Sequence, residues 1–428
     1  MALGLFVCAF VVLLLLGAPI AFTFLVPSML YMAVTGTSLI LVGQTMLQQF
    51  TNFVLIAIPL FILAGELMNT SGITNRIFSF SHALAGHIRG GFGHVNVIGS
   101  LIFAGISGSS AADAAGMGRV EIKAMVERGY RPAFAAAITA ASSTVGPIIP
   151  PSIGLVIYGA IAEVGVDWLF MAGVVPGFLL GVALMVAIWI QVVTGREDCP
   201  IEPFAGWRAL IRTFIGAFAA LAMPAIIIGG LVTGLLTPTE AGCAAVLLAL
   251  ALGAAYGDLR IADLLPALMR SVRSSATVMF ILATVGLFAW VLTVERAPDH
   301  VAQAMFSLTD ETWVMMLLIL VTLLILGCFE TATANLLICT PILVPIAPAL
   351  GIDLVHLGVI LVFALAIGHI TPPVGMTLFI VIDITRLPMS TIVHAITPYL
   401  IAMIVALFLV AYWPELTLWL PRQFGYSG

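Results

Sequence analysis

Two double-proline segments, one in each half of the chain, interrupt two apolar stretches that are each long enough to cross a bilayer. The first reads Gly146-Pro147-Ile148-Ile149-Pro150-Pro151-Ser152, and the second reads Gly368-His369-Ile370-Thr371-Pro372-Pro373-Val374. A proline removes a backbone donor and displaces the carbonyl four residues earlier, so each pair should break its helix. In lipid, broken backbone survives only where protein or a watery cavity covers it. A matched pair of broken spans in two halves of a chain is typical of a transporter's binding site.

The composition places the whole chain in a membrane. Of 428 residues, 62% are hydrophobic and only 8% are charged, so we expect an all-α polytopic protein in a lipid bilayer without a globular extramembrane domain or a nucleic-acid partner. Residues 1–16 lack a basic start and a clear cleavage site, which favours a retained first span over a signal peptide. The five cysteines form neither a disulfide framework nor a metal-binding pattern, so no transition metal is expected.

Hydrophobicity predicts about ten spanning helices and two re-entrant hairpins. The spans are expected at residues 2–18, 20–35, 52–70, 132–165, 168–194, 213–236, 239–256, 274–294, 355–385 and 388–412. The hairpins are expected at about residues 94–130 and 312–349, where small and polar residues interrupt apolar stretches too short to span twice. Residues 38–50 and 257–273 are too short or too polar to span. They are interpreted as helices lying in the interface, either as struts between parts or as plain connectors.

Landmarks in the two halves repeat at nearly one offset. Gly146, Pro150, Pro151 and Pro176 recur with unchanged spacing as Gly368, Pro372, Pro373 and Pro398. Each half then holds five crossings and one hairpin, and because five is odd the second half should be inverted. With both termini outside, thirteen of the fifteen Lys and Arg residues fall on the inner side, in agreement with the positive-inside rule.

Oxygen atoms should gather at the two breaks. The prolines are expected to free the carbonyls of Gly146 and Pro147 in the first break and of Gly368 and His369 in the second. Hard cations prefer oxygen ligands, so Na⁺ is the natural hypothesis. The hairpin centres, Ser107-Gly108-Ser109-Ser110-Ala111-Ala112-Asp113 and Glu330-Thr331-Ala332-Thr333-Ala334-Asn335, add hydroxyls and half-helix N-termini that attract anions.

Each of these features also has a purely structural interpretation. A double proline can be only a kink, and small hydroxyl-rich patches also serve close helix packing. Asp113 and Glu330 are carboxylates predicted at mid-depth, where charge normally marks function. Either one can nevertheless act only as an acceptor for amides at its hairpin tip.

These segments resemble the large membrane subunit of TRAP transporters (tripartite ATP-independent periplasmic transporters, DctM-like). The stretch Phe103-Ala104-Gly105-Ile106-Ser107-Gly108-Ser109-Ser110-Ala111-Ala112-Asp113 is similar to the first hairpin of that family, and the two proline segments are similar to its unwound helices. Leu236-Thr237-Pro238-Thr239-Glu240-Ala241-Gly242 resembles a further family segment. The likeness covers almost the whole chain.

The resemblance implies an elevator-type secondary transporter of the bacterial inner membrane. It implies sodium-coupled uptake of a small organic anion, a carboxylate or sialic-acid-like compound, with a periplasmic substrate-binding protein and a small four-helix membrane subunit as partners. We expect that subunit to be a separate chain, and both termini are expected to be periplasmic. Na⁺ is the coupling ion, and no organic cofactor is expected.

The resemblance also assigns residues to sites. Sodium site 1 combines Ser107, Gly108, Ser109 and Ser110 with Gly146, Pro147 and Pro150, and sodium site 2 combines Glu330, Thr331 and Thr333 with Gly368, His369 and Thr371. The substrate is expected at Ser110, Ser152, Thr333, Asn335 and Thr377, and Asp113 stands apart as a further candidate.

Scaffold and transport domains are expected to alternate along the chain. The scaffold takes residues 1–70 and 195–298, the transport domain takes residues 71–194 and 299–412, and residues 413–428 form a tail. An alternative is a binding-protein-independent exchanger or proton-coupled symporter of similar architecture. An intramembrane enzyme is disfavoured, since the sequence offers no paired aspartates, metal-binding histidine motif or Ser-His pair at matched depth.

Overall fold

The computed structural model describes residues 2–197, 199–309 and 311–428, and in these ranges the chain is helical throughout, without a strand. The first half contains α1 (Ala2–Leu15), α2 (Ile20–Thr35), α3 (Ile40–Phe50), η1 (Phe53–Ile56), α4 (Ala57–Thr70), α5 (Ile73–Ala85), α6 (Gly91–Ser107), α7 (Ser110–Ala115), α8 (Met117–Glu127), α9 (Pro132–Ser143), α10 (Ile153–Ala162) and α11 (Val166–Val193). The second half contains α12 (Trp207–Val232), α13 (Pro238–Tyr256), α14 (Ile261–Val294), α15 (Ala297–Leu308), α16 (Thr312–Gly327), α17 (Ala332–Leu343), η2 (Ala347–Leu350), α18 (Leu354–Gly368), α19 (Met376–Thr385), α20 (Met389–Tyr412) and α21 (Glu415–Gln423).

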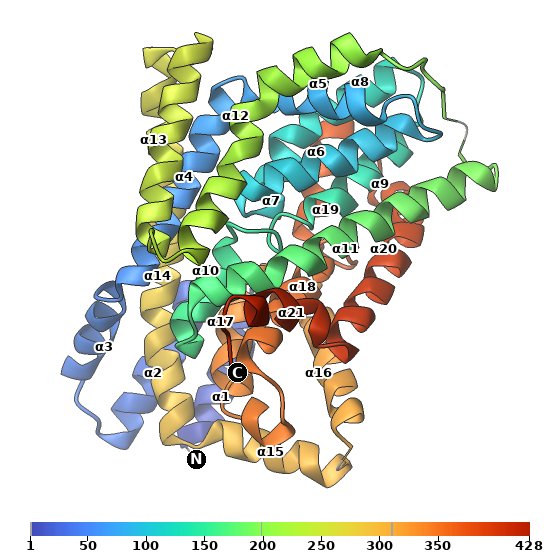
Figure 1. Cartoon of the computed structure of the whole chain (residues 1–428). Coiled ribbons are helices and arrows are strands. Elements are labelled where there is room, and N and C mark those ends of the chain that lie inside the picture. The colour runs from blue at the N-terminus through green and yellow to red at the C-terminus, as the bar shows by residue number, and fades with distance from the viewer. Residues whose placement is uncertain (1, 198, 310) are drawn as a thin grey trace.

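The order of elements repeats between the halves, as the sequence predicts. Helix α2 ends at Gly36 with a φ of 72°, and α13 ends at Gly257 with a φ of 71°, so both helices close with a left-handed glycine. Helices α6 to α8 form the first hairpin and α16 and α17 the second. Figure 1 shows the first hairpin toward the top of the molecule and the second toward the bottom, as expected of an inverted repeat.

Six continuous helices are long and apolar enough to cross a membrane within the described ranges. They are 53–70, 166–193, 207–232, 238–256, 261–294 and 389–412, and they correspond to six of the ten predicted spans. Helices α1 and α2 are apolar but shorter. The remaining two predicted spans are each divided by a double proline, into α9 and α10 and into α18 and α19.

The interfacial segment predicted at residues 257–273 is different in the structure. It is the first part of α14, a single helix of 34 residues that also contains the predicted span at 274–294. No glycine or proline lies between Pro266 and Gly286, so nothing in the sequence stops the helix at the junction. The other predicted arm, α3, does end before its span, because Asn52 accepts a hydrogen bond from the Val54 amide and starts a new turn.

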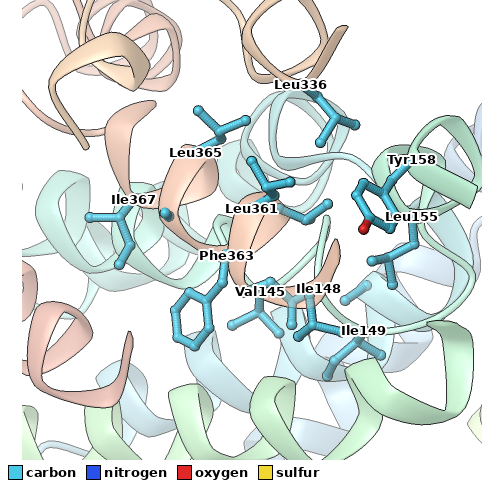
Figure 2. Packing of buried hydrophobic residues seen from close by; sticks show 14 of the residues in the cluster. Val145, Ile148, Ile149, Leu155, Tyr158, Leu336, Leu361, Phe363, Leu365 and Ile367 are labelled. Atoms are coloured by element: carbon cyan, nitrogen blue, oxygen red, sulfur yellow. The ribbon is translucent and has the colours of Figure 1, made fainter. Parts of the chain in front are cut away.

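The two halves interlock at the centre of the molecule. Helix α7 of the first hairpin packs on α19 of the second broken helix, and α17 of the second hairpin packs on α10 of the first. Figure 2 shows Val145, Ile148 and Ile149 of the first break together with side chains of α10, α17 and α18. This buried apolar cluster holds both breaks in place beneath the hairpin tips.

Candidate functional site

A cavity of about 470 Å³ lies where the two hairpin tips meet α4 and α14. Helices α4 and α14 supply one wall, with Ile62, Gly65, Glu66, Asn69, Ser274 and Val278. The opposite wall comes from tip 1 (residues 107–110), tip 2 (residues 329–332), and the ends of the broken helices, with Pro147, Ile153, Gly154 and His369 among its members. The cavity therefore lies between the two groups of segments that the sequence assigns to scaffold and transport domains.

Tip 1 is a sharp reversal between α6 and α7. Gly108 has a φ of 61°, which favours glycine, and a Cβ built there would lie 2.4 Å from the carbonyl oxygen of Pro151. Ser109 caps α7 by accepting a hydrogen bond from the Ala112 amide at 3.4 Å. The absence of a side chain at Gly108 thus allows tip 1 to rest directly on break 1 (residues 144–152).

Break 1 leaves the Gly146 carbonyl without a hydrogen-bond partner among the described residues. Ser152 caps α10 by accepting from the Leu155 amide at 3.2 Å, and its hydroxyl donates to the Pro147 carbonyl. The Gly146 carbonyl accepts no hydrogen bond from the described residues. Of the two carbonyls predicted to be freed here, that of Pro147 is therefore bonded again and that of Gly146 is free. The peptide bond between Pro150 and Pro151 is cis.

Tip 2 repeats the cap of tip 1. Thr331 is the counterpart of Ser109 in the repeat, and it accepts a hydrogen bond from the Ala334 amide at 3.2 Å, which starts α17. Asn335 donates from Nδ2 to the carbonyls of Leu326, at 2.9 Å, and Glu330, at 3.3 Å. These bonds tie the returning helix of the hairpin to the end of the outgoing one.

Break 2 (residues 369–375) differs from the prediction in its carbonyls. The Gly368 carbonyl accepts from the Thr371 amide at 3.0 Å, and the His369 carbonyl accepts from the Thr377 amide at 3.1 Å. Both are bonded because the chain folds back on itself as a tight turn. Each carbonyl oxygen still has a second lone pair. The Pro372–Pro373 peptide bond is cis, like its counterpart in break 1.

The His369 imidazole lies between the tips. Its Nδ1 is 3.2 Å from the Ser110 hydroxyl, and its Nε2 accepts a hydrogen bond from the Ala332 amide. An accepting Nε2 carries no proton, so the neutral ring donates from Nδ1 to Ser110.

Two buried carboxylates lie inside the first hairpin. Asp113 and Glu121 are each 1% exposed, and none of their four oxygen atoms has a hydrogen-bond partner among the described residues. Ser100 lies close to Asp113 but donates to Ser142 at 3.1 Å instead. Sequence reasoning singled out Asp113 and missed Glu121, because an acidic residue in an amphipathic helix ordinarily faces water.

The predicted site residues separate into two groups. The cavity wall includes Ser107, Gly108, Ser109, Ser110, Pro147, Thr333 and His369. The other group shapes or supports the wall from behind: Gly146, Pro150, Ser152, Glu330, Thr331, Asn335, Gly368, Thr371 and Thr377. Among the residues expected to bind substrate, Ser110 and Thr333 reach the cavity, whereas Ser152, Asn335 and Thr377 are buried and make local hydrogen bonds.

The contribution of α4 and α14 to the cavity was missed from the sequence. Ile62, Gly65, Glu66 and Asn69 are spaced as one face of a helix, which is the signal that was available. The Glu66 carboxylate is bound by Arg270, with 2.8 Å between Oε2 and Nε. This ion pair joins α4 to α14 at the edge of the cavity.

The linker between the halves is bound to α5, to the end of α8 and to the start of α9. Glu202 lies 2.7 Å from His82 Nε2 and 3.0 Å from Arg128 Nε, and Arg131 binds Glu197. Partial burial acts to raise the pKa of Glu202, but the hydrogen bonds and charges of His82 and Arg128 outweigh it, so the pKa is lowered from its ordinary value. Residues 195–197 and 199–206 are therefore held to the hairpin side of the molecule.

Comparison with known families gives one match over most of the chain. Residues 7–416 fit the family described as "Tripartite ATP-independent periplasmic transporter, DctM component".

Several characterised relatives are similar over nearly their full length. The chain is 40% identical to the sialic acid TRAP transporter large permease protein SiaM of Vibrio cholerae, covering 97% of both proteins. It is 41% identical to the C4-dicarboxylate TRAP transporter large permease protein DctM of Pseudomonas aeruginosa, covering 88% of both. The 2,3-diketo-L-gulonate TRAP transporter large permease protein YiaN of Escherichia coli is 34% identical, again with 88% of both covered.

Two solved transporters share the fold at low sequence identity. The YdaH transporter of Alcanivorax borkumensis superposes with a TM-score of 0.63 and 15% identity, covering 87% of both chains. MtrF of Neisseria gonorrhoeae, described within a class of antimetabolite efflux pumps, superposes with a TM-score of 0.60 and 13% identity, covering 88% of this chain and 84% of that one.

Proposed function

This chain belongs to the DctM component family of the tripartite ATP-independent periplasmic transporters, and from that premise we propose that it imports a small organic anion by using the energy of a sodium gradient. Its relatives are permeases and not enzymes, so the reaction is transport without chemistry. The observation that supports the proposal best is the cavity at which two broken helices, two capped hairpin tips and the α4–α14 wall meet.

The oxygen atoms near break 1 fit a sodium ion. Ser107 is 3% exposed and its Oγ has no hydrogen-bond partner among the described residues, and the Gly146 carbonyl is also without one. Burying an oxygen atom without a hydrogen bond costs free energy unless a ligand binds it. Hard cations prefer oxygen ligands. Ser107, Gly146 and the backbone of Gly108 to Ser110 would form sodium site 1.

A second sodium site would form at tip 2 and break 2. Glu330 would contribute a partly buried carboxylate from tip 2, and Thr331, Thr333 and Thr371 would contribute hydroxyl oxygens. The carbonyls of Gly368 and His369 would add their unused lone pairs. Binding at both sites would hold the tips in the geometry that the anion recognises.

The substrate would lie in the cavity between Ser110 and Thr333. Its carboxylate would accept hydrogen bonds from their hydroxyls and from free amides at the start of the half-helices. The relatives are named for sialic acid, C4-dicarboxylates and 2,3-diketo-L-gulonate, all of which are small organic acids. A carboxylate-bearing compound of this size class is the proposed cargo.

In the proposed transport movement, the two walls of the cavity would belong to two bodies that move relative to each other. The hairpins and broken helices would slide as one body against α4 and α14, carrying the bound ions and anion across an inner membrane in which both termini are periplasmic. The sliding body takes residues 71–194 and 299–412, and the hairpins are re-entrant. A small four-helix membrane subunit would support the scaffold, and a periplasmic binding protein would deliver the anion.

The proposal is tested in proteoliposomes that contain the chain, its small subunit and its binding protein. Uptake of labelled sialic acid, succinate and 2,3-diketo-L-gulonate is measured with an inward Na⁺ gradient and with K⁺ in place of Na⁺. We expect one of these anions to accumulate only with the Na⁺ gradient. Uptake at the same rate without Na⁺ would contradict the coupling, and uptake without the binding protein would favour an exchanger.

Ser107→Ala tests sodium site 1 at a single atom. Because Ser107 Oγ has no hydrogen bond to lose, the sodium-free protein should keep its melting temperature. The Na⁺ concentration for half-maximal uptake should rise roughly tenfold or more, the usual effect of losing one contact to a charged group. Ser143→Ala is the matched control, since the Ser143 hydroxyl is buried but donates to the Ala140 carbonyl at 2.8 Å. Equal sodium dependence in both variants would count against the site.

A further inference from the structure

The His369 ring joins equivalent positions of the two hairpins. Ser110 and Ala332 correspond to each other in the repeat, each follows a capping residue, and each is the first residue of its returning helix. The ring contacts the Ser110 hydroxyl through Nδ1 and the Ala332 amide through Nε2. One side chain therefore contacts equivalent residues of the two hairpins.

This bridge has no counterpart in the repeat. The residue of the first half that corresponds to His369 is Pro147, whose side chain can neither donate nor accept a hydrogen bond. The two halves therefore do not require the bridge as a consequence of duplication. It is a property of break 2 alone, which reaches across to both tips.

The bridge also lies at the cavity. His369, Ser110 and Ala332 all belong to its wall, between the oxygen atoms proposed for sodium sites 1 and 2. When an ion orders one tip, the ring fixes the position of a donor or acceptor on the other tip. A shared rigid element of this kind couples two binding events, and couplings of this kind are commonly about 5- to 150-fold in affinity.

We propose that His369 is a positioning residue that couples the two hairpin tips, so that sodium binding at one tip favours the ordered form of the other. The inference rests on the proposed sodium-coupled function. The ring acts through Ser110 and Ala332 and is not itself a ligand of the ion. Without the bridge, the two tips bind sodium as independent sites.

The test compares His369→Leu, which loses both hydrogen bonds, with His369→Gln, whose carboxamide keeps one donor and one acceptor at a similar spacing. Wild type and both variants are titrated with NaCl in the proteoliposomes described above. Hydrogen–deuterium exchange of residues 107–113 and 329–335 is followed in parallel. The exchange measurement reports the order of each tip directly and does not depend on uptake.

In the wild type, both tips should become protected from exchange at the same Na⁺ concentration. The uptake rate should rise steeply with Na⁺ concentration. In His369→Leu the two midpoints should separate by roughly tenfold and the Hill coefficient should fall toward one, with the maximal rate changed less than the sodium dependence. His369→Gln should restore the common midpoint. If His369→Leu does not fold, His369→Asn replaces it, because its shorter carboxamide reaches only one tip.

The outcomes separate the two proposals. A sodium-dependent wild type together with a His369→Leu variant that keeps one common midpoint overturns the coupling role and leaves the sodium sites intact. A wild type whose uptake and exchange both ignore Na⁺ overturns the proposed function and the coupling with it. Failure of His369→Gln to restore coupling also contradicts the role of the two hydrogen bonds.

Discussion

Ser109 and Thr331 use their side-chain oxygens to cap α7 and α17. Fewer hydroxyl oxygens are therefore free to bind a ligand than the hydroxyl-rich tips suggest. Each accepts a hydrogen bond from the amide three residues later, as helix N-caps commonly do. The hydroxyl that remains unbonded at tip 1 is that of Ser107. Helix capping and ligand binding therefore compete for the hydroxyl oxygens of Ser and Thr.

Gly108 is expected to tolerate no side chain. An alanine there would have to keep a left-handed φ of 61°, at a cost of about 1–2 kcal/mol. Its Cβ would also lie 2.4 Å from the Pro151 carbonyl oxygen, so tip 1 would have to move off break 1. We therefore expect Gly108→Ala to lower the melting temperature and abolish uptake. Gly4→Ala is the control, because a Cβ at Gly4 meets no atom within 4 Å; similar losses in both variants would contradict the argument.

Asp113 occupies the place that Asn335 takes in the other hairpin. Asn335 donates two hydrogen bonds to carbonyls of its own hairpin, whereas the Asp113 carboxylate has no partner among the described residues. Asp113→Asn should therefore supply donors to hairpin 1 and keep or raise the melting temperature. Asp113→Ala should lower it by leaving a small cavity. Thermal unfolding of the wild type and both purified variants decides this, and an Asn variant less stable than the wild type would argue that the carboxylate itself is required.

Sequence reasoning located the residues with strong local signals and missed those defined by tertiary contact. The double prolines and the small, hydroxyl-rich hairpin centres are recognisable from a few neighbouring positions. The bridge from His369 to Ser110 joins residues 259 positions apart, and no local pattern indicates it. The same reason explains why the face of α4 that carries Glu66 and lines the cavity was not predicted.

Among elements, the broken helices are set by the paired prolines, whereas the arm helices differ because only α3 is followed by a capping residue. Break 1 begins where α9 ends, and the helix resumes as α10 at Ile153, in agreement with the predicted interruption. The second arm was predicted to stop before its span, but α14 continues because nothing between Pro266 and Gly286 terminates it. A change of polarity along a helix marks a change of environment and does not by itself end the helix.

Replacing Pro150 and Pro151 together by alanine should let α9 and α10 join. Two backbone donors would return, and the Gly146 carbonyl could rejoin a helical ladder instead of facing the site. We expect expression and membrane insertion to remain and uptake to be lost. Pro398→Ala in the continuous helix α20 is the control, since that proline does not divide its helix, and it should retain most activity. Normal uptake in the double variant would remove break 1 from the mechanism.

For the whole molecule, the attachment of the linker between the halves should weaken in acid. The pKa of Glu202 is lowered, so its ion pairs contribute stability above its ordinary value of 4.5 and lose it as the pH falls below that value through the folded pKa. Because the Glu202 side chain is 33% exposed, the effect should be modest.

Hydrogen–deuterium exchange of residues 195–206 measures this directly. Protection in the wild type should decline below about pH 4.5, where Glu202 gains a proton. Glu202→Gln should show weak protection at neutral pH and little further change on acidification. A Gln variant that follows the wild-type pH profile would show that another group holds the linker.

The interlocking of α7 with α19 and of α10 with α17 has a consequence for how such a chain arose. An ancestral polypeptide of half this length would expose the helix faces that the other half of the chain now covers. It would be stable in lipid only as a dimer with another copy of itself inserted in the opposite orientation. A later gene fusion would then make that encounter permanent and free it from dependence on concentration.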